Sequence, residues 1–201
     1  MKLWLVRHAR PLVDAGVCYG ALEVQADSQA TREAARALAH VLPPGLRARV
    51  SPRSRCRQLA DALHVLRPDL RFEPDARLAE MDFGEWEGRA WDAIGQDALD
   101  RWTADFLNHR SGGAESVDLF MARVEAALQE AWRAGEDALW VTHAGVARAV
   151  RLLVQGLPRP VAASGWPTSG LACGAAICID CAPYRAPVAV TFGRQGGRSQ
   201  P

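Results

Sequence analysis

Short apolar runs alternate with helix-like patterns along this chain, and that alternation is its strongest constraint on the fold. The strand-like runs fall at residues 2–6, 47–50, 70–72, 138–142, 174–181 and 188–192. Apolar side chains recur at helical spacing over residues 29–42, 51–66, 91–108, 117–131 and 145–154. Strands and helices in this order predict an α/β fold, a three-layer α/β/α sandwich with helices on both faces of the sheet.

Length and charge describe an ordinary globular protein. A chain of 201 residues is expected to form a single domain over residues 1–201, with 193–201 as a frayed tail. The net charge is +1, from 24 Lys and Arg against 23 Asp and Glu, which argues against a nucleic-acid partner. Every apolar run is shorter than the about 18 residues of a membrane span, so we expect no membrane partner.

The five cysteines are an odd number, and no signal-peptide pattern precedes the first strand-like run. We therefore expect free thiols in a reducing cytoplasm. Cys178 and Cys181 form a lone C-x-x-C, a spacing that occurs in metal and redox sites. Their position in a strand-like run favours buried, inert cysteines instead.

Polar residues with phosphate-binding chemistry follow three of the strand-like runs. Arg7 and His8 follow the first run, and His143 follows the fourth. The second run ends at Ser51, which is followed by proline and predicts a helix N-cap, with Arg55 in the first turn. Ligands of open α/β sheets bind beyond the carboxyl ends of the strands. We therefore expect these side chains to share one crevice if their strands are neighbours.

The chemistry of such a crevice favours an anion. A helix N-terminus presents unpaired N–H groups, and the guanidinium groups of Arg7 and Arg55 match phosphate oxygens. Beside these cations, the protonated forms of His8 and His143 are disfavoured. A neutral imidazole is then available as a nucleophile.

The crevice also needs a proton donor, and residues 78–88 offer four carboxyl groups. Glu80 fits by its position, because nearby aromatic side chains and a filled phosphate pocket would keep its proton in place. On the residues alone its rivals are Asp82, Glu85 and Glu87. In the same region, Trp86 and Trp91 fit either a wall for a base or sugar or core packing, which is the commoner use of tryptophan.

Four motifs resemble those of the histidine phosphatases, the phosphoglycerate mutase-like superfamily, and occur in the same order. They are Leu5-Val6-Arg7-His8, Ser51-Pro52-Arg53-Ser54-Arg55-Cys56-Arg57-Gln58, Leu78-Ala79-Glu80 with Phe83-Gly84-Glu85-Trp86-Glu87-Gly88, and Thr142-His143-Ala144-Gly145-Val146-Ala147-Arg148. One motif alone is weak evidence, whereas four in order over most of the chain are strong evidence. The resemblance implies the mixed sheet of that superfamily.

The resemblance also implies a role for each site residue. His8 would take the phosphoryl group as phosphohistidine, and Glu80 would protonate the leaving alcohol and then activate water. His143 would complete the catalytic set. The phosphate-binding residues that the resemblance implies are Arg7, Arg55, His143 and Ala144. Neither a metal nor another cofactor is expected, because protein side chains supply the positive charge.

This chain departs from the family at the first motif. The family usually has glycine after the first histidine, then an acidic or polar residue and threonine, whereas this chain has Ala9-Arg10-Pro11. Residues 16–20 resemble a loop of α-ribazole phosphatases, although Glu23 stands where an aspartate is common in that subgroup. The candidate substrate contacts are Arg10, Tyr19, Gly20 and Glu115. Glu115 fits an ordinary helix start equally well.

Three functions are consistent with these residues. The first is a small-molecule phosphomonoesterase, with α-ribazole 5′-phosphate as the leading substrate and sugar phosphates or nucleotides close behind. The second is a cofactor-dependent phosphoglycerate mutase. Such enzymes resemble longer chains that have an extra segment near the one matching residues 78–88, so this compact chain fits that activity less well. The third is a catalytically weak module that binds phospho-ligands, which the complete set of site residues disfavours. The sequence leaves the oligomeric state open.

Overall fold

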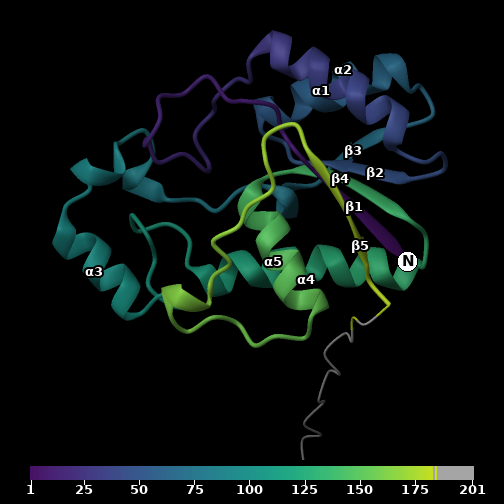
Figure 1. Ribbon diagram of the computed structural model, residues 1–201. Coiled ribbons are helices and arrows are strands. Elements are labelled where there is room, and N and C mark those ends of the chain that lie inside the picture. The colour runs from purple at the N-terminus through teal and green to yellow at the C-terminus, as the bar shows by residue number, and fades with distance from the viewer. Residues whose placement is uncertain (183, 185–201) are drawn as a thin grey trace, which may run out of the picture.

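A mixed sheet forms the centre of the protein, whose computed structural model describes residues 1–182 and 184 (Figure 1). Within these residues the sheet has five strands in the order β3-β2-β4-β1-β5. They are β1 (Lys2–Arg7), β2 (Arg47–Val50), β3 (Phe72–Pro74), β4 (Ala138–Thr142) and β5 (Ala176–Asp180). Only β5 runs antiparallel to its neighbour among them. The strand expected at 188–192 and the tail at 193–201 lie outside the described residues.

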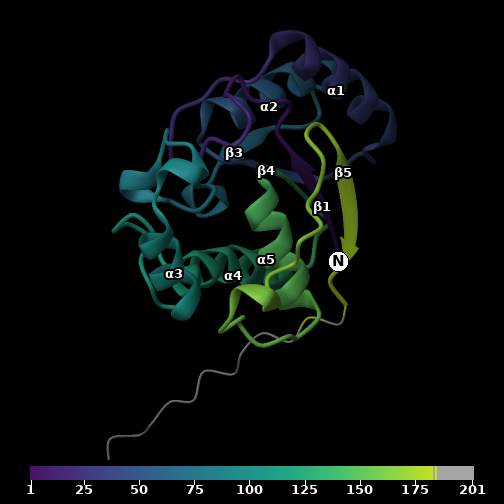
Figure 2. The ribbon, with the colours of Figure 1, turned by 60° about the vertical axis from the view of Figure 1, so that its left-hand side comes forward.

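Helices cover both faces of this sheet, which confirms the expected three-layer sandwich (Figures 1 and 2). On one face α1 (Ser28–Val41) and α2 (Ser54–Leu66) pack together, and on the other α4 (Val117–Ala134) packs with α5 (Ala144–Val154). The helix α3 (Gln96–Ala104) lies apart from both layers, beyond the end of the sheet opposite to the N-terminus (Figure 1).

The strand β4 shows why the two layers form. All five of its residues are buried, as expected for a continuous apolar run in a parallel sheet. Side chains alternate between the faces of a strand. Leu139 and Val141 accordingly join the core beneath α1 and α2, while Trp140 joins the core beneath α4 and α5.

The register of the parallel strands aligns the residues that follow them. Arg7 pairs with Thr142, and Val50 pairs with Val141. The ladder continues one step further, because the N–H of His8 donates to the carbonyl of Thr142 at 3.0 Å and that of Ser51 donates to Val141 at 2.9 Å. The polar residues after β1, β2 and β4 therefore meet at one edge of the sheet.

The start of α2 differs from the sequence prediction. Ser51 is not the N-cap, because the helix begins at Ser54 with Arg53 at the cap position. The carboxylate of Glu23 accepts hydrogen bonds from the Ser54 N–H at 3.2 Å and from the Ser54 hydroxyl at 2.6 Å. A distant carboxylate thus satisfies the helix end, and the Ser51 hydroxyl is available for another partner.

The segment between β3 and α4 is also more broken than its sequence suggests. The helix expected at 91–108 divides into a 3₁₀ turn (Trp91–Ala93) and α3, because Gly95 adopts a φ of 90° that interrupts the helix. The stretch expected to be loop, 75–88, contains two 3₁₀ turns at Ala76–Leu78 and Gly84–Trp86. The third strand is displaced from 70–72 to Phe72–Pro74.

The described residues include all five cysteines, and each has a free thiol. Cys181 is buried as expected, whereas the expectation was wrong for Cys178, which is exposed because β5 is the last strand of the sheet among the described residues. Within the described part of the chain, no helix combines the length and the apolar character that crossing a bilayer requires.

Candidate active site

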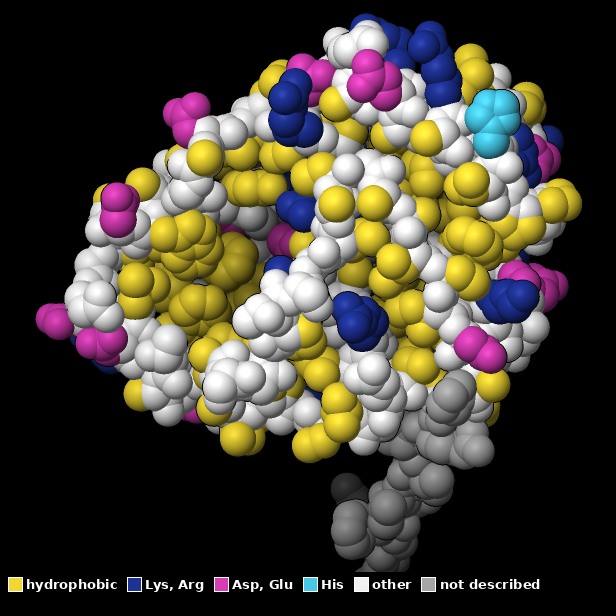
Figure 3. Space-filling model, viewed as in Figure 1, with side chains coloured by type: hydrophobic (Ala, Val, Ile, Leu, Met, Phe, Trp, Pro, Cys, Tyr) yellow, Lys and Arg dark blue, Asp and Glu magenta, His cyan; other side chains and the backbone are white. Residues whose placement is uncertain are grey.

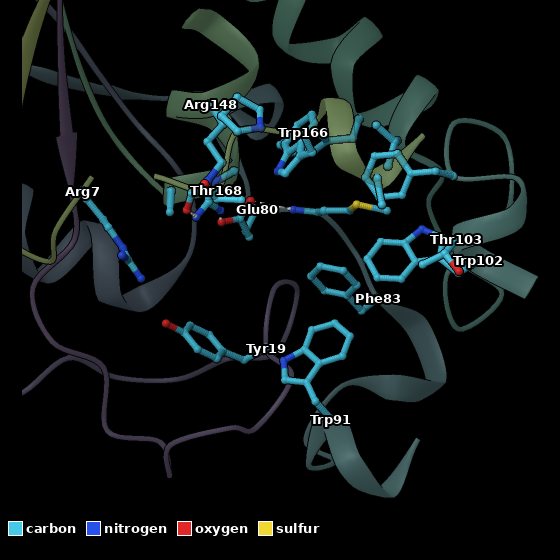
Figure 4. Close-up of a pocket in the computed structure, with 18 of the residues that line it drawn as sticks. Arg7, Tyr19, Glu80, Phe83, Trp91, Trp102, Thr103, Arg148, Trp166 and Thr168 are labelled. Atoms are coloured by element: carbon cyan, nitrogen blue, oxygen red, sulfur yellow. Dashed lines mark hydrogen bonds between the residues drawn. The ribbon is translucent and has the colours of Figure 1, made fainter. Parts of the chain in front are cut away.

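A cavity of about 500 Å³ opens beyond the carboxyl ends of β1 and β4. At one end it is lined by the expected site residues Arg7, His8, Glu80 and Ala144. Figure 4 shows Arg7 on one side and a group of aromatic rings on the other, with Tyr19 between them. In Figure 3 the same hollow is lined with apolar side chains, and charged groups lie at its inner edge.

The His8 ring is buried, with 1% of its surface exposed, and its Nδ1 lies 2.7 Å from the carbonyl oxygen of Ala9. A carbonyl only accepts hydrogen bonds, so Nδ1 carries the proton and Nε2 keeps its lone pair. Burial lowers the pKa of His8 to about 3, helped by the charges of Arg55 and Arg7 and opposed by the bond to Ala9. His8 is therefore neutral near pH 7, with a free nucleophilic nitrogen.

His143 lies beside His8, with ring centroids 5.2 Å apart. Its Nε2 shares a hydrogen bond of 2.8 Å with the Ser51 hydroxyl and lies 3.5 Å from Sγ of Cys56. Burial holds the pKa of His143 well below its usual value, with the positive charge of Arg55 acting in the same direction. The strand register described above thus creates a pair of neutral imidazoles.

Two guanidinium groups supply positive charge next to these rings. Arg55 is completely buried, and its Nη atoms donate to the carbonyls of Leu22 at 2.9 Å and Gly20 at 2.6 Å. Arg7 donates to the carbonyl of Leu171 at 2.8 Å. Among the described residues, neither arginine has a carboxylate partner, and the Nε of each lacks a hydrogen bond. Burying unpaired charge is costly, so the site favours an anion.

Of the candidate substrate contacts near this charge, Tyr19 lines the cavity, and the Arg55 guanidinium lies 5.3 Å from the centre of its ring. Gly20 instead holds Arg55 through its carbonyl. A Cβ atom at Gly20 would lie 1.8 Å from the carbonyl oxygen of Met81, so only glycine permits this approach of two loops. Gly20 is thus placed to position Arg55, with its carbonyl engaged by that guanidinium.

The Glu80 carboxyl group reaches the cavity at the start of α5. Its Oε2 accepts a hydrogen bond of 3.0 Å from the N–H of Gly145, and its Oε1 accepts one of 3.2 Å from Met81. A Cβ atom at Gly145 would lie 2.1 Å from Oε1, so glycine makes room for the carboxyl group. Glu80 is therefore held within the same cavity as His8.

The rival carboxyl groups are engaged elsewhere. Glu87 accepts hydrogen bonds from four backbone N–H groups, those of Gly20, Ala21, Leu22 and Phe83. Asp82 accepts a bond of 2.8 Å from the N–H of Gly84, and Glu85 is exposed. Of the four carboxyl groups, Glu80 is the one that lines the cavity with His8.

Glu115, a candidate substrate contact, forms an ion pair with Arg123 of α4 instead, at 2.7 Å. Its other oxygen accepts the N–H of Asp82 at 3.0 Å. Arg123 also donates to the carbonyls of Arg77 at 2.8 Å, Ala79 at 2.6 Å and Glu80 at 2.9 Å. The pair clamps the backbone that carries Glu80 from behind, outside the cavity.

Arg10 is likewise placed outside the cavity. Its side chain is 71% exposed and forms an ion pair of 3.3 Å with Asp27, the N-cap residue of α1. The unusual residue after Ala9 therefore supports a helix end on the surface.

Several residues that the structure places in the site were not predicted to belong to it. Ser51 was expected as a helix cap, and Arg148, the last residue of the fourth motif, lines the cavity with its Nη2 3.3 Å from the carbonyl of Thr168. Both residues lie within the four motifs, and this was the signal by which the sequence could have marked them as site residues. Trp102 and Trp166 also line the cavity, and neither lies in one of the four motifs.

Among residues 1–182 and 184, no three His, Cys, Asp or Glu side chains gather as metal ligands would, and the absence of a metal stays a prediction.

The sequence profile described as histidine phosphatase superfamily (branch 1) matches residues 3–164. This chain belongs to that superfamily. Membership of this superfamily makes the protein a phosphatase of the histidine type that acts on a phosphate ester, as the four motifs predicted. No curated protein sequence matches the chain significantly.

Solved structures of this superfamily have the same fold. The α-ribazole phosphatase from Shigella flexneri matches with a TM-score of 0.75 and 23% identity over 90% of each chain. A mycobacterial glucosyl-3-phosphoglycerate phosphatase gives 0.73 and 22% over 88% of each chain. A protein from Thermus thermophilus gives 0.67 and 29%, covering 94% of this chain and 98% of its own. These similarities confirm the phosphoglycerate mutase-like fold.

The buried neutral imidazole of His8 predicts a pH dependence of stability. Its pKa of about 3 in the folded protein lies below the value of about 6.5 expected after unfolding. The unfolded chain then binds more protons between these limits, so stability is complete above about pH 6.5 and falls as pH drops. The slope is up to about 1.4 kcal/mol per pH unit for one such group.

Chemical denaturation of a His8→Asn variant between pH 7 and pH 4 tests this expectation. As the pH falls, the free energy of unfolding of the variant should decrease less per pH unit than that of the wild type. A matched His109→Asn variant, changed at a histidine outside the cavity, should keep the wild-type slope. Equal slopes in all three proteins would show that His8 is not buried as a neutral ring.

The position of the Arg123–Glu115 clamp predicts that breaking it slows the hydrolysis of esters with poor leaving groups more than that of aryl esters. Arg123→Ala should lower kcat/KM for an alkyl phosphate by about 100-fold, a typical value for displacing a catalytic group such as the predicted acid Glu80, and for 4-nitrophenyl phosphate by less than tenfold. Only the alkyl alcohol needs a proton to leave. Arg133→Ala, an exposed change on the same helix, serves as the control. Equal losses on both esters, with the fold intact, would contradict the positioning role.

Proposed function

We propose that this phosphatase is a phosphomonoesterase that transfers the phosphoryl group of a small molecule to Nε2 of His8. The observation that carries the proposal is the tautomer of His8, since the bond to Ala9 fixes the proton on Nδ1 and leaves Nε2 free. Arg7 and Arg55 are close enough to lower the pKa of His8, and their charges would attract the ester and stabilise charge on its oxygens.

In the first step, the Nε2 lone pair attacks phosphorus and the bond from phosphorus to the ester oxygen breaks. Glu80 gives its proton to that oxygen, so that the alcohol leaves neutral. The His8 ring gains positive charge as phosphohistidine, which the adjacent phosphoryl oxygens balance. Arg7, Arg55, His143 and the start of α5 at Ala144 hold those oxygens throughout.

In the second step, water attacks the phosphohistidine and the bond from nitrogen to phosphorus breaks. Glu80, now a carboxylate, takes a proton from the water, which restores its starting form. Inorganic phosphate leaves, and His8 returns to its neutral tautomer. Each residue thus ends the cycle as it began.

We propose α-ribazole 5′-phosphate as the leading substrate. The support is the resemblance of residues 16–20 to a loop of α-ribazole phosphatases and the position of Tyr19, from that loop, in the cavity. Sugar phosphates and nucleotides are the second group, in line with the phosphoglycerate ester named for the mycobacterial relative. The five free thiols support a reducing, cytoplasmic location.

A panel of phosphate esters assayed for release of inorganic phosphate tests the activity and ranks the substrates. Conversion of 3-phosphoglycerate only in the presence of bisphosphoglycerate would instead indicate a mutase. A His8→Ala variant that hydrolyses esters as fast as wild type would remove the proposed nucleophile and favour a binding module.

The role of Glu80 predicts how a Glu80→Gln variant responds to the leaving group. The amide has no proton to give at that position, so kcat on an alkyl phosphate should fall by about 100-fold or more. On 4-nitrophenyl phosphate, whose leaving group departs as an anion, the first step should slow much less. Rapid-mixing measurement of alcohol release separates this step from hydrolysis of the phosphoenzyme. Equal losses on both esters would contradict the assignment.

A further inference from the structure

The cavity is larger than the group of residues that would bind phosphate. Its volume of about 500 Å³ falls in the range of pockets that enclose a whole small molecule. The charged side chains that line it, Arg7, Glu80 and Arg148, lie away from Trp91 and Trp102 (Figure 4). The other end is free to receive the alcohol portion of the ester.

That other end is formed by a connected arc of aromatic rings. Trp91 and Trp102 stack with centroids 6.2 Å apart and planes 12° apart, and Phe83 meets both edge-on at 5.5 and 6.2 Å. The arc continues from Trp102 through Phe106 to Trp166, with centroids 5.4 and 6.3 Å apart. Figure 4 shows the labelled members of this aromatic arc facing the cavity.

The members of the arc come from separate parts of the chain. Phe83 belongs to residues 78–88, the segment that carries Glu80. Trp91 and Trp102 belong to the 3₁₀ turn at Trp91–Ala93 and to α3, and Trp166 belongs to the stretch after α5. Four of the rings keep part of their surface exposed: Phe83, Trp91, Trp102 and Trp166. Trp86, in contrast, is 6% exposed and packs in the core with Cys18 and Ile94. The sequence left two roles open for both tryptophans, and the structure places Trp91 in the cavity wall and Trp86 in the core.

The polarity of the arc argues against a leaving group rich in hydroxyls. Each hydroxyl taken from water needs a replacement hydrogen bond, or it costs about 1–3 kcal/mol. Three hydroxyl residues line the cavity, and two of them, Tyr19 and Thr168, lie toward the charged side chains (Figure 4). The third, Thr103, lies beside the arc, and its hydroxyl is directed to its own helix, 3.0 Å from the carbonyl of Leu99 and 3.1 Å from that of Asp100. Flat apolar groups gain from both burial and ring stacking at such a surface.

We propose that the leaving alcohol carries an aromatic or similarly flat apolar ring, and that the aromatic arc, with Trp91 and Trp102 at its centre, selects for it. This inference rests on the proposed phosphomonoesterase function and specifies its substrate class. The ring would sit against the arc while the phosphate lies at Arg7 and His8, so one molecule spans both ends of the cavity.

The test compares three esters of primary alcohols: 3-phenylpropyl phosphate, propyl phosphate and glycerol 3-phosphate. The wild-type protein should show a kcat/KM for the phenylpropyl ester at least about tenfold above that for the other two, since burying a ring favours binding by that factor or more. Comparable values for all three esters would overturn the inference and leave the phosphatase proposal standing. Absence of hydrolysis with every ester would overturn the phosphatase proposal itself.

Variants of the arc locate the selectivity. Trp102→Leu and Trp91→Leu keep apolar bulk but remove a ring face, and each should reduce the preference for the phenylpropyl ester at least about fivefold, mainly through KM. Hydrolysis of propyl phosphate reports whether the reacting groups remain in place. Trp132→Leu, on the outer surface of α4, is the matched control and should keep the wild-type preference. An unchanged preference in both arc variants, with normal melting temperatures, would contradict the role of the arc.

Discussion

The hydrogen bond from Nδ1 of His8 to the carbonyl oxygen of Ala9, 2.7 Å long, determines the chemistry available in the cavity. It fixes the proton on one ring nitrogen, and burial together with the nearby guanidinium groups keeps the other nitrogen unprotonated. Those guanidinium groups also favour an anionic ligand. The same guanidinium groups therefore have two effects, since the charges that disfavour the imidazolium are also the charges that we propose to bind phosphate.

The sheet provides the geometry for this arrangement. Because β1 and β4 are parallel neighbours in register, the residues that follow them, His8 and His143, meet at their carboxyl ends. The adjacent strand β2 contributes Ser51, whose hydroxyl bonds to His143. Residues 75–115 close the other side. There the Arg123–Glu115 pair holds the backbone that carries Glu80, and aromatic rings line the remaining space.

The sequence alone predicted what depends on local pattern. Apolar periodicity located the strands and helices, and the motifs located Arg7, His8, Arg55 and His143, because each lies at the end of a strand, directly after one or in the first turn of a helix. Contacts between distant segments could not be predicted in this way. The partner of Ser51 depends on the order of strands, and the role of Glu115 depends on Arg123 of α4. The aromatic arc likewise exists only once four separate segments are folded together, and of its rings only Phe83 lies in one of the four motifs.

The central claim is that Nε2 of His8 accepts the phosphoryl group, and trapping the phosphoenzyme tests it most directly. Enzyme quenched in denaturant at alkaline pH during turnover of a phosphate ester can be digested and mapped by mass spectrometry. The structure predicts one phosphoryl group per chain, on the peptide that contains His8, with phosphorus-31 NMR assigning it to Nε2. A phosphoryl group on His143 or on any other residue, or steady turnover with unmodified His8, would contradict the claim.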